Sequence, residues 1–348
     1  MSRAIRATCS YSRWMPRRFL VPAAGPAGPR RDREADTDYG APDRPDWRDI
    51  DWRRELKTVE VDGLPVNYVD IEPRAQPADR EPVVFVHGLG GQWQNWLENL
   101  PRVAQERRVL ALDLPGFGLT PMPDERISIS GYGRFVDAFC TALGLDQVAL
   151  VGNSMGGYIT AEIAIQFPAR VSRLVLVSAA GVSSADVLQA PILTAGRAIT
   201  ALTAYGSARE RELAARPLAR HMTLALVARH PRLLKADFAY EGFYKGASKP
   251  GFTDALRACL DYDFRDRLPD VHVPTLIVWG EKDAIIPARD ANEFERLIAD
   301  SRKVVMRDTG HVPMAERPKA FNDVLLGFLD ETGPAEHGEA VPGESQVA

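Results

Sequence analysis

The stretch VALVGNSMGGYITAEIAIQFP, from Val148 to Pro168, decides the fold of this chain. Its first residues, Val148–Val151, form a short apolar run that is typical of a buried strand. After Ser154, apolar residues recur every fourth position until Pro168 stops the pattern, which is the spacing of a helix. The stretch therefore predicts a strand, a very tight turn and a helix, with Ser154 at the apex of the turn.

The glycines around Ser154 indicate a nucleophile. Gly152 and Gly156 lie two residues before and two residues after it, in the pattern G-x-S-x-G. In so sharp a turn the neighbouring backbone comes close enough for a Cβ at either flank to clash. We therefore expect a strained Ser154 whose hydroxyl is lifted clear of the sheet. The N–H of Met155 would begin the helix, where an oxyanion is favoured. The same pattern also occurs in purely structural turns, so its chemistry needs partners.

Composition excludes several classes of protein. Of the 348 residues, 45% are hydrophobic and 26% are charged, which is typical of a globular protein. A net charge of −4 and a pI near 5.9 disfavour nucleic acid as a main partner. No apolar run approaches the roughly 18 residues of a membrane span. The three cysteines have no metal-ligand spacing and indicate neither a disulfide framework nor a metal site, so we expect a cytoplasmic protein.

The two ends of the chain differ from its centre. Residues 1–31 contain seven arginines and no acidic residue. We expect residues 1–52 to be a disordered basic arm and linker, and residues 331–348 to be a disordered tail. Two alternatives remain for the arm: weak contact with an anionic membrane surface, or a transit peptide. The oligomeric state stays open.

Further apolar segments predict a sheet. They alternate with helical segments, which indicates an α/β fold with a doubly wound, mostly parallel sheet covered on both faces. The first two are separated by the turn dipeptide Asp62-Gly63 and predict a hairpin. We expect residues 53–181 and 263–330 to form the two parts of this core. The predicted strands are Leu56–Val61, Pro65–Ile71, Pro82–Val86, Arg108–Leu112, Leu174–Val177, Thr275–Val278 and Lys303–Met306.

The strand pattern stops between residues 182 and 262, where helical patterns take over. They cover Ala190–Tyr205, Arg209–Arg229 and Phe252–Leu260. We interpret residues 182–262 as a helical cap inserted into the core. Five apolar or aromatic residues in its first segment either line a binding cavity or belong to ordinary core; these are Ile192, Leu193, Ile199, Leu202 and Tyr205.

A serine nucleophile needs a base to take its proton and an acid to orient that base. His311 follows the last predicted strand, and Asp283 follows the strand before it. Because parallel strands end at one edge of a sheet, Ser154, Asp283 and His311 can meet there. Asp113 also follows a strand, but it precedes a glycine-rich turn, and we expect it to be structural. His87 is likewise expected to bind loop backbone.

Five motifs together resemble the α/β-hydrolase superfamily, over roughly residues 55–330. The resemblance implies a serine-nucleophile enzyme of the esterase or lipase type with a helical cap. It also implies the catalytic order Ser, Asp, His and an oxyanion hole made by the N–H groups of Leu89 and Met155. Neither a metal nor an organic cofactor is implied. The motifs are HGLGG (87–91), DLPGFG (113–118), GNSMGG (152–157), WGEKD (279–283) and GHVPMAERP (310–318).

The predicted activity is hydrolysis of carboxylic esters of small to medium hydrophobic substrates. A serine nucleophile disfavours epoxide hydrolase and haloalkane dehalogenase chemistry. GNSMGG also resembles carbon–carbon hydrolases of ring-fission diketones, which typically have G-P-G after the HG loop and Trp after the catalytic histidine. Here GLGGQW and Val312 stand at those places. A cofactor-free haloperoxidase and an inactive receptor for a hydrophobic ligand are further alternatives.

Overall fold

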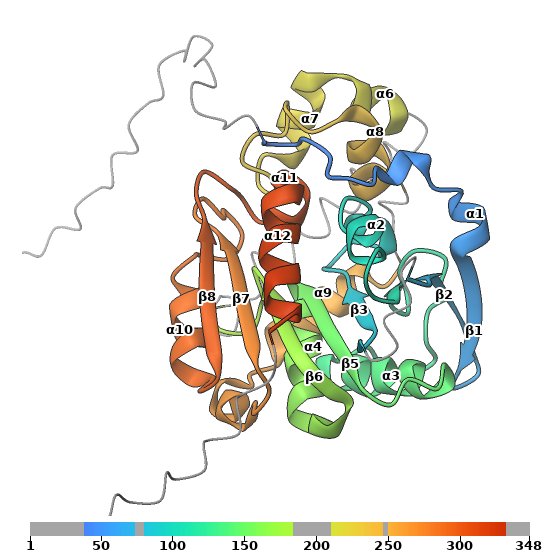
Figure 1. Ribbon diagram of the computed structural model, residues 1–348, viewed down its shortest axis with the longest axis vertical. Helices are drawn as coiled ribbons and strands as arrows, with labels where there is room; N and C mark the ends of the chain where they lie inside the picture. Colours follow the sequence, from blue (N-terminus) through green and yellow to red (C-terminus); the bar gives the residue numbers. More distant parts are fainter. Residues whose placement is uncertain (1–37, 74–79, 184–209, 246–249, 332–348) are drawn as a thin grey trace, which may run out of the picture. The chain divides into compact units, whose positions relative to one another are not determined.

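The computed structural model describes residues 38–73, 80–183, 210–245 and 250–331. Within these residues eight strands form one sheet in the order β1-β2-β4-β3-β5-β6-β7-β8, in which β2 runs antiparallel to both neighbours and the rest are parallel (Figure 1). The predicted mostly parallel sheet and its hairpin are confirmed. The strands are β1 (Leu56–Val61), β2 (Leu64–Ile71), β3 (Val83–Val86), β4 (Val109–Leu112), β5 (Val148–Asn153), β6 (Val171–Val177), β7 (Thr275–Gly280) and β8 (Ser301–Met306).

Both faces of the central strands are apolar, because each face has its own core. Val84 and Leu150 face one core, whereas Phe85 and Val151, their neighbours in the chain, face the other. Strands buried on both faces need continuous apolar runs, which explains why these segments do not alternate with polar residues. The first core is covered by α3 (Ile129–Ala142), α4 (Met155–Gln166), α9 (Phe252–Asp261) and α10 (Asp290–Leu297).

The second core lies under helices on the opposite face, where α12 crosses in front of the strands in Figure 1. After the HG motif the chain forms two short helical pieces, η2 and α2. Besides η2, three further 3₁₀ helices lie in connections of the described chain: η1 (Trp47–Asp49), η3 (Pro168–Arg170) and η7 (Arg265–Asp270). The helices on this face are η2 (Trp93–Trp96), α2 (Leu100–Val103), α11 (Pro313–Glu316) and α12 (Pro318–Leu329).

The described part of the predicted cap is helical. Pro217 divides the helix expected over Arg209–Arg229, since proline starts a helix readily but interrupts one from within. Residues Ala190–Tyr205, with the five candidate lining residues, lie outside the described residues, so the limits of the cap stay a prediction. The elements are α6 (Glu210–Ala215), α7 (Pro217–Leu224), α8 (Ala236–Ala239) and the π-helical η6 (Tyr240–Tyr244).

Residues 38–52, which we call the N-terminal strap, correct the prediction of a disordered linker up to residue 52. The strap leads into α1 (Trp52–Glu55) and is folded against the second core. Tyr39 and Trp47 are buried, and Trp52 packs on Trp93 with ring centroids 5.1 Å apart. The segment is polar on average, but a few large aromatic rings bury enough apolar area to hold it. Residues 1–37 and 332–348 lie outside the described residues.

One contact of the strap predicts a pH dependence of stability. Glu98 is buried and accepts a hydrogen bond from Trp47 Nε1 at 2.9 Å. Burial raises the pKa of Glu98 from 4.5 to about 7; Trp47 and Arg48 lower it in part, and Asp46 and Asp237 raise it. A carboxyl that holds its proton more tightly when folded stabilises fully at low pH. That contribution is lost as the pH rises from 4.5 through 7.

Replacing Glu98 by glutamine should remove this dependence, because the amide stays neutral and keeps an oxygen for Trp47. The free energy of unfolding of Glu98→Gln, relative to the wild type, should rise by about 2 kcal/mol between pH 5 and pH 8. Urea unfolding at several pH values measures it. Glu72→Gln, at a largely exposed side chain, is the control. Parallel curves for Glu98→Gln and the wild type would contradict the prediction.

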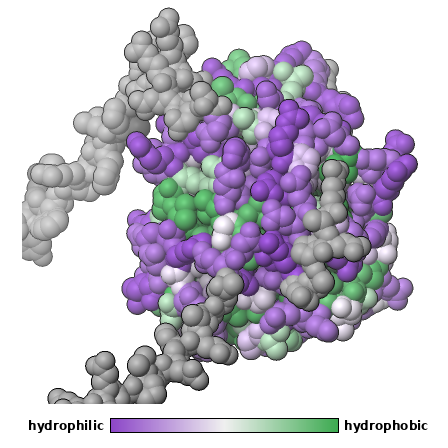
Figure 2. Space-filling model, in the orientation of Figure 1, coloured by the Kyte–Doolittle hydropathy of each residue, from purple (hydrophilic) through white to green (hydrophobic). Residues whose placement is uncertain are grey.

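None of the helices in the described residues is long and apolar enough to cross a bilayer. Figure 2 shows a face dominated by hydrophilic residues, with small hydrophobic areas between them.

Candidate active site

The turn at Ser154 has the strained geometry that its sequence predicts. Ser154 directly follows β5 and precedes α4, with φ 55° and ψ −116°. Non-glycine residues rarely adopt a positive φ, so the surrounding backbone must hold it. The Ser154 N–H donates to Val177 O at 2.9 Å, and its carbonyl accepts from the N–H groups of Tyr158 at 3.1 Å and Ala180 at 3.0 Å. These bonds fix the serine at the carboxyl edge of the sheet.

Glycine is required on both sides of the serine. A Cβ on Gly152 would lie 2.3 Å from Gly156 O, and one on Gly156 would lie 2.2 Å from Val86 O. Both obstacles are backbone atoms of packed elements and cannot move aside. The HG loop is adjacent, because a Cβ on Gly88 would lie 3.2 Å from the Cβ of Ser154.

His311 and Asp283 form a hydrogen-bonded pair. The distance from His311 Nδ1 to Asp283 Oδ2 is 2.7 Å, and the Asp283 side chain is fully buried. Its other oxygen accepts from the N–H groups of Ile285 at 2.8 Å and Ile286 at 2.9 Å, which fixes the carboxylate. When Nδ1–H donates to Asp283, Nε2 is the nitrogen left to accept a proton.

The fold brings these three residues to one edge. Ser154 follows β5, Asp283 follows β7 and His311 comes after β8, and these strands are parallel. Asn153, the residue before Ser154, links the serine turn directly to the backbone of His311. Its Nδ2 donates to His311 O at 3.3 Å and also to Val177 O, at the end of β6, at 3.0 Å. Its importance was missed in the sequence, where it is only the variable residue before the serine.

The two backbone N–H groups that the sequence analysis expects to bind an oxyanion belong to Leu89 and Met155. Met155 is the first residue of α4, and Leu89 belongs to the loop whose Gly88 lies against Ser154. In the described part of the chain neither N–H donates to a protein acceptor. Free donors at a helix N-terminus favour negative charge.

Asp113 and His87 have the structural roles that we expected. Asp113 accepts hydrogen bonds from Trp93 N at 2.9 Å, Leu119 N at 2.9 Å and Asn67 Nδ2 at 2.8 Å. His87 Nε2 accepts from Leu114 N at 3.0 Å. Both side chains therefore hold loops together and are buried in doing so.

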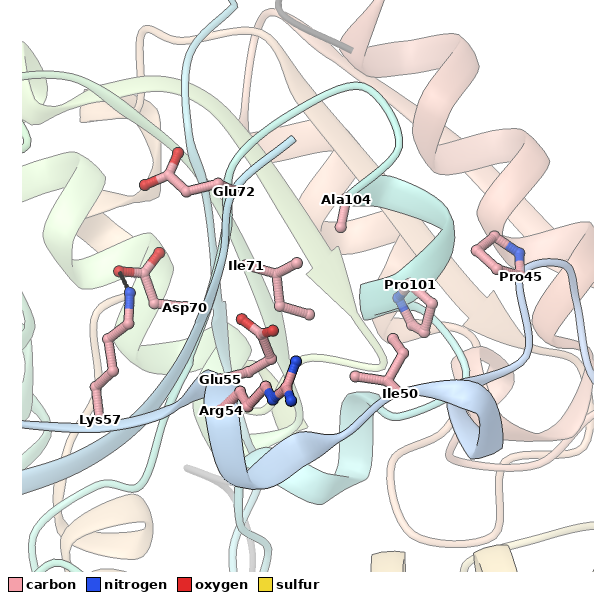
Figure 3. A pocket seen from close by; sticks show the side chains of 10 residues that line it. All are labelled: Pro45, Ile50, Arg54, Glu55, Lys57, Asp70, Ile71, Glu72, Pro101 and Ala104. Carbon is pink, nitrogen blue, oxygen red and sulfur yellow. Dashed lines mark hydrogen bonds and ion pairs between the residues drawn. The ribbon is translucent and has the colours of Figure 1, made fainter. Parts of the chain in front are cut away.

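Other candidate centres are remote or inert. Among the described residues no group of three or more His, Cys, Asp or Glu could hold a metal ion. Cys140 and Cys259 are free and buried, and burial raises the pKa of each to about 12, so neither is a ready nucleophile. A cavity of about 330 Å³ lies among the strap, α1, β1, β2 and α2, and no predicted site residue lines it. Figure 3 shows the side chains that line it.

The fold and the site define a hydrolase of the α/β type. The chain belongs to the α/β-hydrolase family, because the family model of the alpha/beta hydrolase fold matches residues 81–318. It is 32% identical over 267 residues to 2-hydroxy-6-oxo-2,4-heptadienoate hydrolase of Pseudomonas putida, covering 71% of this chain and 88% of that one.

Two solved structures are also similar. A membrane phospholipase A, described as a bacterial virulence factor, is 28% identical with a TM-score of 0.62, over 79% of this chain and 85% of the other. A serine hydrolase involved in carbazole degradation is 26% identical with a TM-score of 0.60, over 79% and 98% of the two chains. The relatives thus include enzymes with different substrates.

Proposed function

We propose that the protein hydrolyses carboxylic esters of small to medium hydrophobic substrates through an acyl-enzyme on Ser154. The observation that carries the proposal is the 2.7 Å bond between His311 Nδ1 and the fully buried carboxylate of Asp283, at the same sheet edge as the strained serine. An imidazole that is paired with a carboxylate, at the same sheet edge as a strained and partly exposed serine, is the arrangement expected to activate a hydroxyl.

The mechanism follows from the roles of these groups. His311 Nε2 takes the proton of Ser154 Oγ as the oxygen attacks the ester carbonyl. The N–H groups of Leu89 and Met155 stabilise the negative oxygen, and loss of one such donor typically costs about 3 kcal/mol of barrier. The imidazolium then protonates the leaving alcohol. Throughout, Asp283 holds the His311 ring in the required tautomer and orientation. Water, deprotonated by His311, finally cleaves the acyl-enzyme.

A second candidate is a carbon–carbon hydrolase, which the Pseudomonas relative favours. The substrate in that enzyme's name carries a carboxylate, and a buried carboxylate calls for a cation. The three buried arginines in the described residues are all bound to protein acceptors. Arg107 pairs with Glu81 and Asp330, Arg220 binds the carbonyls of Pro231 and Arg232, and Arg317 binds Thr309 and Asp38.

The direct test of an activated serine is covalent labelling. A fluorophosphonate should add to Ser154 of the wild type and should fail to label Ser154→Ala, as read by mass spectrometry of the intact protein and its peptides. Labelling at another residue, or none in the wild type, would contradict the proposal. The latter result would favour a binding protein that keeps the fold.

Substrate preference separates the two candidate reactions. With a cap of apolar residues, each acyl methylene buried contributes about 0.8 kcal/mol, so kcat/KM should rise roughly three- to fourfold per methylene from acetyl to medium chains. A p-nitrophenyl ester series from two to sixteen carbons measures this, with Ser154→Ala as background. A flat or acetyl-favouring series would contradict the apolar cap. Rapid cleavage of a ring-fission diketone with feeble ester turnover would favour the carbon–carbon hydrolase.

A further inference from the structure

A buried carboxylate that the mechanism does not use lies beside the catalytic histidine. Glu316 ends α11 and is completely buried. Its Oε2 accepts hydrogen bonds from Gly310 N at 2.9 Å and Arg229 N at 2.8 Å, and its Oε1 accepts from Val312 N at 3.2 Å. The hydroxyl of Tyr39 donates to the same Oε2. One side chain thus joins three segments: residues 307–312 around His311, which we call the histidine loop, the cap and the N-terminal strap.

These bonds hold the histidine backbone on both sides. Gly310 and Val312 flank His311. The N–H of Gly310 donates to Glu316 Oε2, and the N–H of Val312 donates to Glu316 Oε1. The N–H of His311 itself donates to Val227 O, in the cap, at 2.9 Å. Three consecutive N–H groups therefore have acceptors from other elements. A backbone held in this way determines where the imidazole points, and small displacements of a catalytic group are costly.

Tyr39 connects the strap to Glu316 and the histidine loop through both its hydroxyl and its ring. Its O–H donates to Glu316 Oε2, and its oxygen accepts from His230 N at 2.8 Å. Its ring lies edge-on to the His230 ring at 5.1 Å, and the His230 Nε2 is 2.7 Å from Asp308 Oδ2, in the histidine loop. The next strap residue, Gly40, donates its N–H to Glu316 O at 2.7 Å. The strap therefore binds both the side chain and the backbone carbonyl of Glu316.

We infer that Glu316 and Tyr39 are positioning residues for His311, so that the N-terminal strap is a working part of the active site. The inference rests on the proposed function, because it assigns the strap to the histidine that serves as base there. Neither residue touches the reacting atoms; both act through the backbone of the histidine loop. Strap, cap and loop meet at one carboxylate, so loosening any of them should disturb proton transfer more than substrate binding.

The test is Tyr39→Phe, which removes one hydroxyl and keeps the packed ring. We expect kcat, per active site titrated with fluorophosphonate, to fall roughly tenfold while KM stays within about twofold. Tyr132→Phe is the matched control, because Tyr132 is also buried and its hydroxyl donates to Pro115 O at 2.8 Å, away from His311. Its kcat per titrated site should stay near that of the wild type.

Glu316→Gln is the stronger variant, because its amide would turn an N–H₂ toward backbone donors, and we expect roughly a hundredfold loss of kcat. Equal kcat per titrated site in Tyr39→Phe and Tyr132→Phe would overturn the inference, even if both variants melt at lower temperature. So would a loss confined to KM. A wild type that fluorophosphonate does not label would overturn the proposed function and this inference with it.

Discussion

Ser154→Ala and His311→Ala should each reduce ester turnover by at least about 10⁴-fold, and the double variant should be scarcely worse than either single one. The reason is that the two groups perform one step: without the base the hydroxyl is a poor nucleophile, and without the hydroxyl the base has no proton to take. Turnover per milligram of folded protein, with circular dichroism to confirm the fold, measures the effect.

Ser178→Ala is the control for the serine. Ser178 also follows a parallel strand with a positive φ of 44°, and its buried hydroxyl has no hydrogen-bond partner in the described structure. Its removal should leave turnover near that of the wild type. Multiplicative losses in the Ser154 and His311 double variant would show that one of the two is assigned to the wrong role.

Asp283→Asn should reduce turnover by about 10³- to 10⁴-fold with little loss of stability. The amide has the same shape, and its oxygen can still accept from the N–H groups of Ile285 and Ile286. Its N–H₂ would face Nδ1 of His311, however, and would favour the tautomer that carries its proton on Nε2. The base would then be blocked where it must accept the proton of Ser154.

Asp113→Asn is the contrasting variant. Asp113 is as buried as a catalytic acid and follows β4, but its partners are loop donors such as Trp93 N and Leu119 N. We expect a lower melting temperature with kcat per titrated site nearly unchanged. Near-wild-type turnover of Asp283→Asn would instead return the assignment to Asp113 or to the acidic residues Asp261, Asp263 and Asp266.

The local parts of the site could be predicted from the sequence. The elbow is specified within a few residues, because strand, glycines and helix are consecutive in the chain and the clash that requires glycine is local. The ends of the strands could also be predicted, because a strand buried on both faces needs an apolar run with clear limits. Once parallel strands were expected, chain order alone placed Ser154, Asp283 and His311 at one edge.

Contacts between distant segments were decided only by the tertiary structure. The sequence marked residues 38–52 as a polar linker, yet the aromatic rings of Tyr39, Trp47 and Trp52 find partners far along the chain. Glu316 looked like an ordinary acidic residue in the histidine motif. Its role depends on donors from three segments: the N–H groups of Gly310 and Val312 beside it, the N–H of Arg229 in the cap and the hydroxyl of Tyr39 in the strap, of which the last two reach it only in the fold. Local sequence thus pointed to the groups that we expect to do the chemistry, whereas long-range packing decided what holds them, because hydrogen-bond partners 87 and 277 residues apart leave no local pattern.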